Sequence, residues 1–497
     1  MKPFQTLLFI FGVFLMLFLV AWVFPENGIR VGNFGSLKFA SLSDFLEEDT
    51  VQYADISNIL ESASLTLPEE EPEVEVSLEN DSLAAEVFPE VLDLQIADSD
   101  SLRKITYALE YTGEDPAVLF PFFRKLKNAK SQKKLVRILH YGDSQIEADR
   151  MSSFIRNKMQ VTFGGSGCGT VPVVPLYNGQ LSIKQEYSDN WKRFTGFANV
   201  DSLLEHERFG ALMAFVRQGY ADTVIGSKNK TWLKFQTSAL AYASSRKYSE
   251  VSLYIQGDFE PVRIHVSQND SIIDSLSLKP SRNLKKLKWH FDKTPDELAF
   301  AFSGHGFTNI YGISLDNSWG VALDNIPLRG SAGLVFSKTD TAFLAQMYKM
   351  MDVGMIILQF GGNVIPYMKD NFSAYENYFK RELAVIKKIL PGIPVIVIGP
   401  SDMSIKEKDK FVTYPNLEGV RDAMRKATLE SGFVFWDMYQ AMGGRNSMPS
   451  WVSANPPLAV ADYVHFNASG AKIIAEMFSN ALLNEYRMWS VKTNPAK

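Results

Sequence analysis

The sequence predicts an α/β protein in which a parallel sheet is covered by helices on both faces. In the second half of the chain, short apolar runs alternate with amphipathic helical patterns, as in parallel strands that are joined by helical crossovers. The apolar runs end at turn-forming Gly, Asn, Asp and Pro residues, which mark the ends of buried strands. Residues 181–317 differ, because they show short alternating strands with almost no helical period, which predicts an inserted β-sandwich.

The first strand of the predicted sheet is residues 136–139, an apolar run that leads to Gly142-Asp143-Ser144. A strand, a tight glycine turn and a helical pattern together expose a hydroxyl at the carboxyl end of a sheet, so Ser144 is a candidate nucleophile. The alternative is that Ser144 or Asp143 only caps the helix that follows. Further strands are expected at 321–326, 353–360, 393–398 and 433–436, and helices at 101–130, 375–390, 417–431 and 468–483.

Strands within the inserted region are expected at 231–236, 251–256, 262–266, 287–291 and 298–302. Short strands at this spacing indicate a sandwich of the jelly-roll type, and such modules often bind carbohydrate through aromatic side chains on one face. The candidates for such a platform are Trp191, Phe194, Trp232, Tyr254 and Trp289. The alternative is that these side chains fill the core of the sandwich.

An apolar run at residues 6–24 follows Lys2 and is long enough to span the hydrocarbon core of a bilayer. A signal peptide has a similar pattern, but residues 25–28 offer no small-residue cleavage site, which favours an uncleaved anchor in residues 1–24. A basic residue before the span places the rest of the chain outside the cytoplasm, in the periplasm or at the cell surface. Residues 25–100, which include a strongly acidic run, are expected to form a linker or stalk.

The composition gives no indication of a nucleic-acid partner, a metal or a cofactor. The net charge is −5, which does not suit a polyanionic partner. No Cys and His residues stand at metal-ligand spacing, and with Cys168 as the one cysteine no intramolecular disulfide is possible. The glycine-rich stretch 163–172 lacks the Gly-Lys-Ser/Thr ending of a phosphate-binding loop, and a tight irregular loop near Ser144 is expected there.

Short motifs along the chain, read together, resemble those of the SGNH hydrolases, which are also called the GDSL family. In the order Ser, Gly, Asn and Asp-x-x-His, they are Gly142-Asp143-Ser144-Gln145, residues 325–330, Gly361-Gly362-Asn363 and residues 462–465. The resemblance implies a flavodoxin-like, three-layer αβα domain made of residues 101–180 and 318–497, with residues 181–317 inserted. Because both ends of the insert join segments next to the site, we expect the insert to lie at the rim of the site.

The residue types at these positions supply the parts of an ester-cleaving site. We expect Ser144 to be the nucleophile, His465 to be the base that takes its proton, and Asp462 to orient the imidazole. The oxyanion hole is expected from the backbone N–H groups of Ser144 and Gly330 and from the side-chain amide of Asn363.

The sequence therefore predicts a serine esterase that removes O-acyl groups, in particular acetyl, from a polysaccharide or peptidoglycan of the cell envelope. The N-terminal helix is expected to anchor the enzyme in the cytoplasmic membrane. Two alternatives remain open. An O-acetyltransferase would pass the acyl group to a sugar hydroxyl, and would need a membrane acyltransferase partner to deliver that group across the membrane. A glycan-binding scaffold would keep the fold and leave Ser144 idle.

Overall fold

The computed structural model describes residues 3–25, 29–30, 36–37, 39, 51–64, 107–176, 180–198, 201, 204, 206–218, 231–258, 260–304 and 307–493. The chain divides into two units, Met1–Gln52 and Tyr53–Lys497. In the first unit, α1 (Pro3–Val23) is an apolar helix of 21 residues, and the short strands β1 (Ile29–Arg30) and β2 (Ser36–Leu37) pair antiparallel. Within the described residues, α1 is the one helix that is long and apolar enough to cross a membrane.

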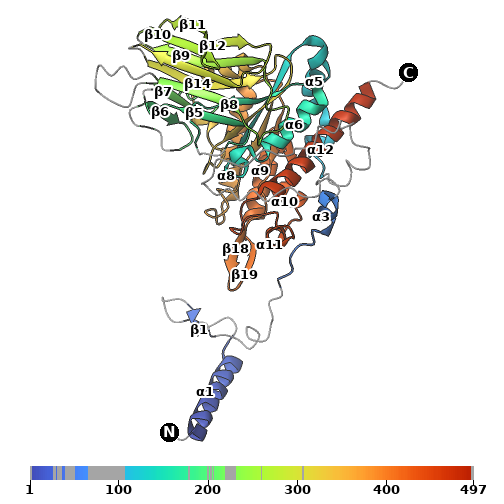
Figure 1. Cartoon of the computed structure of the whole chain (residues 1–497). Coiled ribbons are helices and arrows are strands. Elements are labelled where there is room, and N and C mark those ends of the chain that lie inside the picture. Colours follow the sequence, from blue (N-terminus) through green and yellow to red (C-terminus); the bar gives the residue numbers. More distant parts are fainter. Residues whose placement is uncertain are drawn as a thin grey trace. The chain divides into compact units, whose positions relative to one another are not determined.

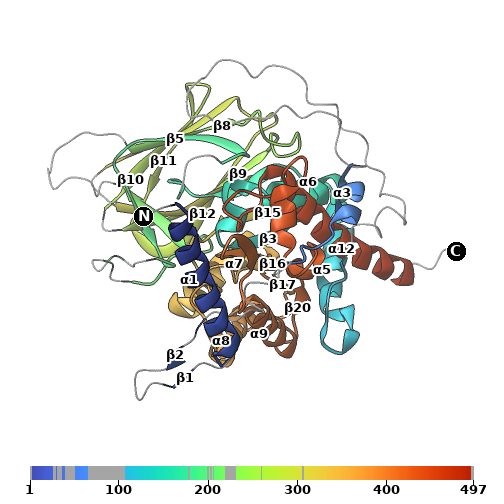
Figure 2. The same cartoon turned by 90° about the horizontal axis from the view of Figure 1, so that it is seen from below.

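The second unit, drawn with the rest of the chain in Figure 1, contains a five-stranded sheet in which all neighbouring strands are parallel; its strands are labelled in Figure 2. Its spatial order is β15 (Gly320–Pro327), β3 (Leu135–Gly142), β16 (Val353–Gln359), β17 (Val395–Ile398) and β20 (Val434–Trp436). The first of these strands in the chain, β3, lies second in the sheet, between β15 and β16. This is the 2-1-3-4-5 strand order of flavodoxin-like folds, as predicted, and in such folds ligands bind at the carboxyl ends of the strands where the order reverses, here β3 and β16.

Helices cover both faces of this sheet (Figure 2). One face packs against α5 (Phe120–Gln132), α6 (Ser152–Phe163) and α12 (Ala468–Thr493), and the other against α7 (Thr341–Met351), α8 (Phe372–Ile389) and α9 (Leu417–Glu430). Shorter helices are α3 (Ser57–Ser64), α10 (Met438–Ala441) and α11 (Ser447–Ser453), with 3-10 turns at Thr112–Glu114, Pro116–Leu119, Ser144–Asp149 and Phe336–Lys338. The prediction of a parallel sheet between helical layers is confirmed.

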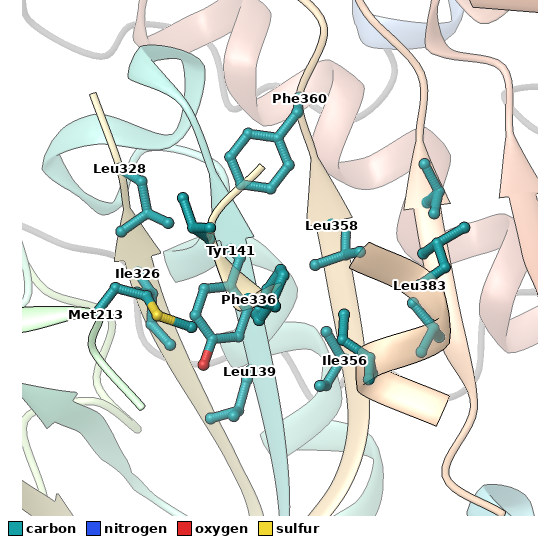
Figure 3. Close-up of a cluster of buried hydrophobic side chains, with 14 of the residues drawn as sticks. Leu139, Tyr141, Met213, Ile326, Leu328, Phe336, Ile356, Leu358, Phe360 and Leu383 are labelled. Carbon is teal, nitrogen blue, oxygen red and sulfur yellow. The ribbon is translucent and has the colours of Figure 1, made fainter. Parts of the chain in front are cut away.

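Successive residues of the central strands alternate between two hydrophobic cores, which explains why these strands are apolar along their length. In β3, Ile138 belongs to the core under α5, α6 and α12, while its neighbour Leu139 belongs to the core under α7, α8 and α9. Tyr141 continues the second core, where its ring packs edge-on against Phe336 with 5.2 Å between the ring centroids (Figure 3). The β3 strand is therefore buried on both faces, and the position at which it ends is fixed by packing on two sides.

The region before β15 forms two antiparallel sheets. One has the order β11 (Ser271–Leu278), β10 (Val262–Gln268), β13 (Glu297–Ser303), β8 (Thr231–Thr237) and β5 (Ile183–Tyr187). The other has the order β12 (Ser281–His290), β9 (Glu250–Asp258), β14 (Phe307–Asp316), β7 (Ala214–Gln218) and β6 (Trp191–Thr195), with β4 (Gly167–Val171) also paired to β14. The two sheets share one hydrophobic core, and the strands predicted within residues 181–317 are confirmed. The jelly-roll assignment stays a prediction.

The aromatic side chains of this β module mostly fill its interior. Trp191, Phe194, Tyr254 and Trp289 are all buried, at 8% exposure or less, so the prediction that these four form an exposed platform is wrong. The indole rings pack edge-on against other aromatic rings of the core, as Trp289 does against Phe300 with 5.3 Å between the centroids. Removing such large apolar surfaces from water stabilises the sandwich, which is why the core takes them. Trp232 is partly exposed and remains a candidate for contact with a glycan.

A buried cluster of charges joins the β module to the parallel sheet. Arg137 of β3 donates from Nη2 to Asp316 at the end of β14 at 2.6 Å, and from Nη1 to Asp324 of β15 at 2.5 Å. All three side chains are at most 3% exposed. Removing one partner from such a cluster leaves an uncompensated buried charge, which typically costs about 3–5 kcal/mol. The cluster therefore fixes β14 against the edge of the parallel sheet.

Residues 53–60, which fall within the predicted linker, pack on the domain that contains the parallel sheet. Ile56 is buried in the core that contains α12, and the backbone N–H of Ala54 donates to the carbonyl oxygen of Asn446 at 3.2 Å. The Ser450 hydroxyl donates to the carbonyl oxygen of Ala54 at 2.7 Å. The rest of the predicted acidic stalk, residues 65–100, lies outside the described residues.

Candidate active site

Ser144, His465 and Asp462 form one hydrogen-bonded series in the structure. Ser144 Oγ lies 2.8 Å from His465 Nε2, and His465 Nδ1 lies 2.7 Å from Asp462 Oδ2. Ser144 and His465 are 321 positions apart in the sequence, so only the fold brings them together. With the Nδ1 proton directed at the carboxylate, Nε2 is the ring nitrogen that can accept the proton of the Ser144 hydroxyl.

Packing at the end of β3 determines where Ser144 stands. A Cβ on Gly142 would come within 3.0 Å of the carbonyl oxygen of Gln359 in β16, so the neighbouring strand end leaves room only for glycine. The carboxylate of Asp143 then accepts the backbone N–H of Gln145 at 3.0 Å and caps the 3-10 turn that starts at Ser144. Asp143 supplies the cap, and the Ser144 hydroxyl is directed toward His465 instead.

The helix predicted directly after Ser144 begins later in the structure. The backbone leaves the helical region at Glu147 (ψ 155°) and Ala148 (φ 57°), and α6 starts only at Ser152. Asp149, just after this break, forms a buried ion pair with Arg156 of α6 at 2.6 Å. The prediction of a continuous helix is therefore wrong, because this buried ion pair and the capped turn replace the first helical turns.

The turn from Asp462 to His465 is held together by a single carboxylate. Oδ1 of Asp462 accepts the backbone N–H groups of Val464 at 2.9 Å and of His465 at 3.0 Å, while Oδ2 accepts from the imidazole. Partial burial raises the pKa of Asp462, but the hydrogen bonds from His465 and Val464 outweigh this effect, so the pKa lies below its usual value. The carboxylate is therefore ionised at neutral pH and fixes the orientation of the ring.

Asp143 joins the serine turn to the loop that carries Asn363. Its buried carboxylate accepts the backbone N–H of Gln145 and also that of Gly362. Burial raises the pKa of Asp143 to about 6, while these hydrogen bonds and the nearby imidazole of His465 act to lower it. From sequence, Asp143 is expected only as a helix cap, and its link to Gly362 depends on a neighbouring strand end that no local pattern reveals.

Gln145 holds the backbone on either side of His465. Its side-chain Nε2 donates to the carbonyl oxygen of Val464 at 2.6 Å and to the Ser401 hydroxyl at 3.1 Å. Its Oε1 accepts a long hydrogen bond from the N–H of Phe466 at 3.5 Å. Gln145 belongs to the serine motif, but no role is predicted for it from sequence. The sequence offers one signal for such a role: Gln145 is a polar residue directly after Ser144, in a segment that must be buried.

The loops that carry Gly330 and Asn363 lie against each other. The side-chain Nδ2 of Asn363 donates to the carbonyl oxygen of Ser331 at 3.2 Å. Gly330 adopts a φ of +76°, which favours glycine, and a Cβ there would meet no atom within 4 Å. Position 330 thus favours glycine because of its backbone conformation and not because neighbouring atoms crowd it. Val364, the residue after Asn363, is buried in the core under α7, α8 and α9.

A buried polar network lies between the ends of β3, β15 and β16. Both ring nitrogens of His140 have a hydrogen-bond partner. Nε2 lies 3.1 Å from Gln359 Oε1, and Nδ1 lies 2.8 Å from the Ser152 hydroxyl. Ser152 lies 2.8 Å from Asn325 Oδ1. Burial lowers the pKa of His140 to about 4, so this ring is neutral at physiological pH. His140 is therefore a structural residue that ties three strands together.

A cavity of about 40 Å³ lies at the seam between the β module and the parallel sheet. Its lining comes from the segment after β4, from β6, β7 and β14, and from the carboxyl end of β15 at Asn325, Ile326 and Pro327. Pro327 is paired in register with Gly142, two residues before Ser144. The β module thus reaches the end of the sheet at which the predicted site residues lie.

The glycine-rich stretch 163–172 is partly a strand, which corrects the expectation of an irregular loop. β4 pairs with β14, and Gly165 and Gly169 approach the backbone of β15 so closely that a Cβ would lie within 2.6 Å of its carbonyl oxygens. The glycines are therefore explained by close packing of two backbones. In the part of the chain that the structure describes, no group of three or more His, Cys, Asp or Glu side chains is placed to hold a metal ion.

Comparison with solved structures identifies a likeness that covers most of the chain. The structure of a peptidoglycan O-acetylesterase matches with 21% identity and a TM-score of 0.59, over 74% of this chain and 96% of that chain. A family two carbohydrate esterase from Cellvibrio japonicus matches at 10% identity, over 62% of this chain and 98% of its own, with a TM-score of 0.24 that is too low to support an argument. No protein-family model and no curated protein matches this chain. The chain thus shares its fold with that peptidoglycan O-acetylesterase.

Proposed function

We propose that this protein is a serine esterase that removes O-acyl groups, in particular acetyl, from a glycan of the cell envelope. The observation that carries the proposal is the hydrogen-bonded series from Ser144 through His465 to Asp462, at 2.8 and 2.7 Å. His465 takes the proton of Ser144 as its oxygen attacks the ester carbonyl. It then returns a proton to the sugar oxygen that leaves, and activates the water that releases the carboxylic acid.

The negative charge that develops on the carbonyl oxygen needs donors beside Ser144. The N–H groups of Ser144 and Gly330 and the amide of Asn363 are proposed for this role. Support comes from the contact between the Gly330 and Asn363 loops, and from Asp143, which ties the Asn363 loop to the serine turn. A donor that is fixed before the reaction needs no reorganisation as charge builds up, which is why such donors lower the barrier.

A polymeric substrate is supported by the openness of the site. The side chains of His465 and Asp462 are 30% and 44% exposed, so the reacting groups are not enclosed as they would be for a small ligand. The solved structure with the same fold is that of a peptidoglycan O-acetylesterase. Both observations favour an acylated glycan over a free small ester, and neither selects one sugar.

The proposed location is outside the cytoplasm, with α1 as a membrane anchor. An α-helix of 21 residues is about 30 Å long, which matches the hydrocarbon core of a bilayer. Nearly all of its side chains are exposed and apolar, an arrangement that is unfavourable in water and favourable in lipid. A signal peptide has the same features, and the mass of the mature protein distinguishes the two.

The test is release of acetate by the full chain, purified in detergent, from 4-nitrophenyl acetate and from O-acetylated peptidoglycan. Ser144→Ala should lower the rate by at least about 10³-fold while leaving the thermal unfolding midpoint unchanged. Full activity of Ser144→Ala would overturn the proposal. A wild-type protein that transfers acetyl to added glycan and releases little acetate would identify a transferase. A wild type that binds glycan but cleaves no ester would identify a scaffold.

A further inference from the structure

A small hairpin stands beside the turn that carries Asp462 and His465. β18 (Ser404–Glu407) and β19 (Lys410–Thr413) pair only with each other and project from the catalytic domain (Figure 1). They follow the carboxyl end of β17, and residues 405–409 at the tip of the hairpin are exposed. An isolated two-stranded hairpin is at best marginally stable in water, so its shape must be held by contacts with the rest of the domain.

The root of the hairpin is fixed to the interior. Asp402 is fully buried, and its carboxylate accepts the Thr413 hydroxyl at 2.7 Å and the backbone N–H of Met448 at 2.8 Å. Thr413 also exchanges hydrogen bonds with Asn446, through its N–H to Oδ1 at 2.9 Å and through its Oγ1 from the Asn446 N–H at 2.7 Å. The hairpin is therefore held rigidly to the domain, and it can fix the position of a residue that it contacts.

The hairpin touches the catalytic turn at one residue, Tyr463. The backbone N–H of Ser404 donates to the carbonyl oxygen of Tyr463 at 3.0 Å. The ring of Phe411 stacks on the ring of Tyr463, with 3.6 Å between the centroids and an angle of 8° between the planes. One contact holds the backbone of Tyr463 and the other holds its side chain, so both the position and the orientation of this residue are defined.

Tyr463 needs such support because its backbone is strained. Its φ is +59°, in the left-handed region that an aromatic residue rarely adopts. This conformation folds the chain back, so that the Asp462 carboxylate can accept the N–H groups of Val464 and His465 as well as the imidazole. If Tyr463 relaxed to an ordinary φ, these three hydrogen bonds to Asp462 would be lost together, and His465 would leave its place beside Ser144.

We propose that Phe411 is a positioning residue, which acts through Tyr463 to hold Asp462 and His465 in line with Ser144. The proposal rests on the esterase function proposed above. Phe411 contacts neither Ser144 nor His465 in any hydrogen bond or ring contact of the described residues, so its effect on them passes through Tyr463 and should lower kcat. A residue that only lined the glycan would instead change KM.

The test is steady-state hydrolysis of 4-nitrophenyl acetate by the full chain. Phe411→Ala should lower kcat by about 10- to 100-fold and change KM by less than about twofold, because small displacements of reacting groups have effects of this size. Phe411→Tyr keeps the flat ring and should retain wild-type kcat. Ile405→Ala, on the other strand of the hairpin, is the matched control and should also retain it. Tyr463→Ala combined with Phe411→Ala should be no slower than the worse single variant, since both remove the same stack.

The proposal would be overturned if Phe411→Ala kept a kcat within twofold of wild type or changed KM alone. It would also be overturned if Phe411→Tyr were as slow as Phe411→Ala, or if the losses in the double variant were additive. If Phe411→Ala shows no cooperative unfolding, Phe411→Leu fills the space without a planar ring and takes its place, with the same expected loss. A wild type without esterase activity would remove the proposed function alone. The rate at which a fluorophosphonate labels Ser144 would then decide, with slower labelling of Phe411→Ala supporting the proposal and equal labelling rejecting it.

Discussion

The side-chain amide of Gln145 donates to the carbonyl oxygen of Val464 at 2.6 Å. Gln145 directly follows the proposed nucleophile, and Val464 directly precedes the proposed base. Together with the longer hydrogen bond from the Phe466 N–H to Gln145 Oε1, this hydrogen bond joins the two backbone segments on which Ser144 Oγ and His465 Nε2 depend for their 2.8 Å contact. The Ser401 hydroxyl, which accepts from the same Nε2 at 3.1 Å, holds the amide in the required orientation.

Gln145→Ala should therefore lower kcat for ester hydrolysis by about 10-fold with little change in KM, because the ester contacts are kept while the base loses its support. The measurement is steady-state kinetics beside thermal unfolding. Gln236→Ala is the control, since Gln236 makes a comparable side-chain hydrogen bond to Glu297 at 3.1 Å, far away in the β module. An unchanged kcat in Gln145→Ala would show that the His465 turn keeps its place without this amide.

Asn363→Ala should lower kcat by about 10²- to 10³-fold, the usual cost of removing one oxyanion donor. The KM should change little, because the donor acts on a charge that is present only in the transition state. Asn371→Ala is a matched control on the same connection, where Asn371 caps α8 by accepting the N–H of Ala374 at 3.1 Å. That variant should lose about 1 kcal/mol of stability and keep its kcat. Equal kcat values for the two variants would exclude Asn363 from the oxyanion hole.

The stability of the protein should depend on pH through Asp402. Burial raises the pKa of this carboxyl from its usual 3.8 to about 6, although hydrogen bonds from Met448, Thr413, Met403 and Ser447 lower it. The folded state therefore binds more protons than the unfolded state between about pH 4 and pH 6, and stability falls as pH rises through this range. The shift of about two pKa units corresponds to roughly 3 kcal/mol.

Urea unfolding of wild type and Asp402→Asn at pH 4.5 and pH 7 measures this effect. The variant cannot ionise, so the wild type should lose roughly 2 kcal/mol relative to it over this interval, which covers most but not all of the shift. Because the comparison is between two proteins at each pH, contributions from other carboxyl groups, such as Asp462, cancel. A difference between the two proteins that does not change with pH would mean that Asp402 titrates at its ordinary value in the folded state.

The order and type of the main elements could be predicted from the sequence, because they depend on local patterns. A strand such as β16 that is buried on both faces must be apolar throughout, and a surface helix such as α9 must carry an apolar stripe. Boundaries were less predictable where distant contacts extend an element. α12 continues ten residues beyond the predicted end at 483, and Trp489 in this extension packs on Phe123 with 5.7 Å between the ring centroids.

The sequence by itself determined which residue types are present in which order: a serine after the first strand, a glycine and an asparagine after the next two, and Asp462 three residues before His465. Only the tertiary structure decided how these residues are supported. The amide of Gln145, the carboxylate of Asp143 and the ring of Phe411 act on segments that are remote in sequence or belong to other strands. Likewise, the five aromatic candidates of the β module could belong to a core or to an exposed platform. Trp191 and Trp289 are buried between the two sheets, and Phe194 and Tyr254 are buried in the core that contains α7, α8 and α9. Hydrophobic periodicity reports which face of one element is buried, but the partner of a polar or aromatic side chain depends on which other element is packed against that face.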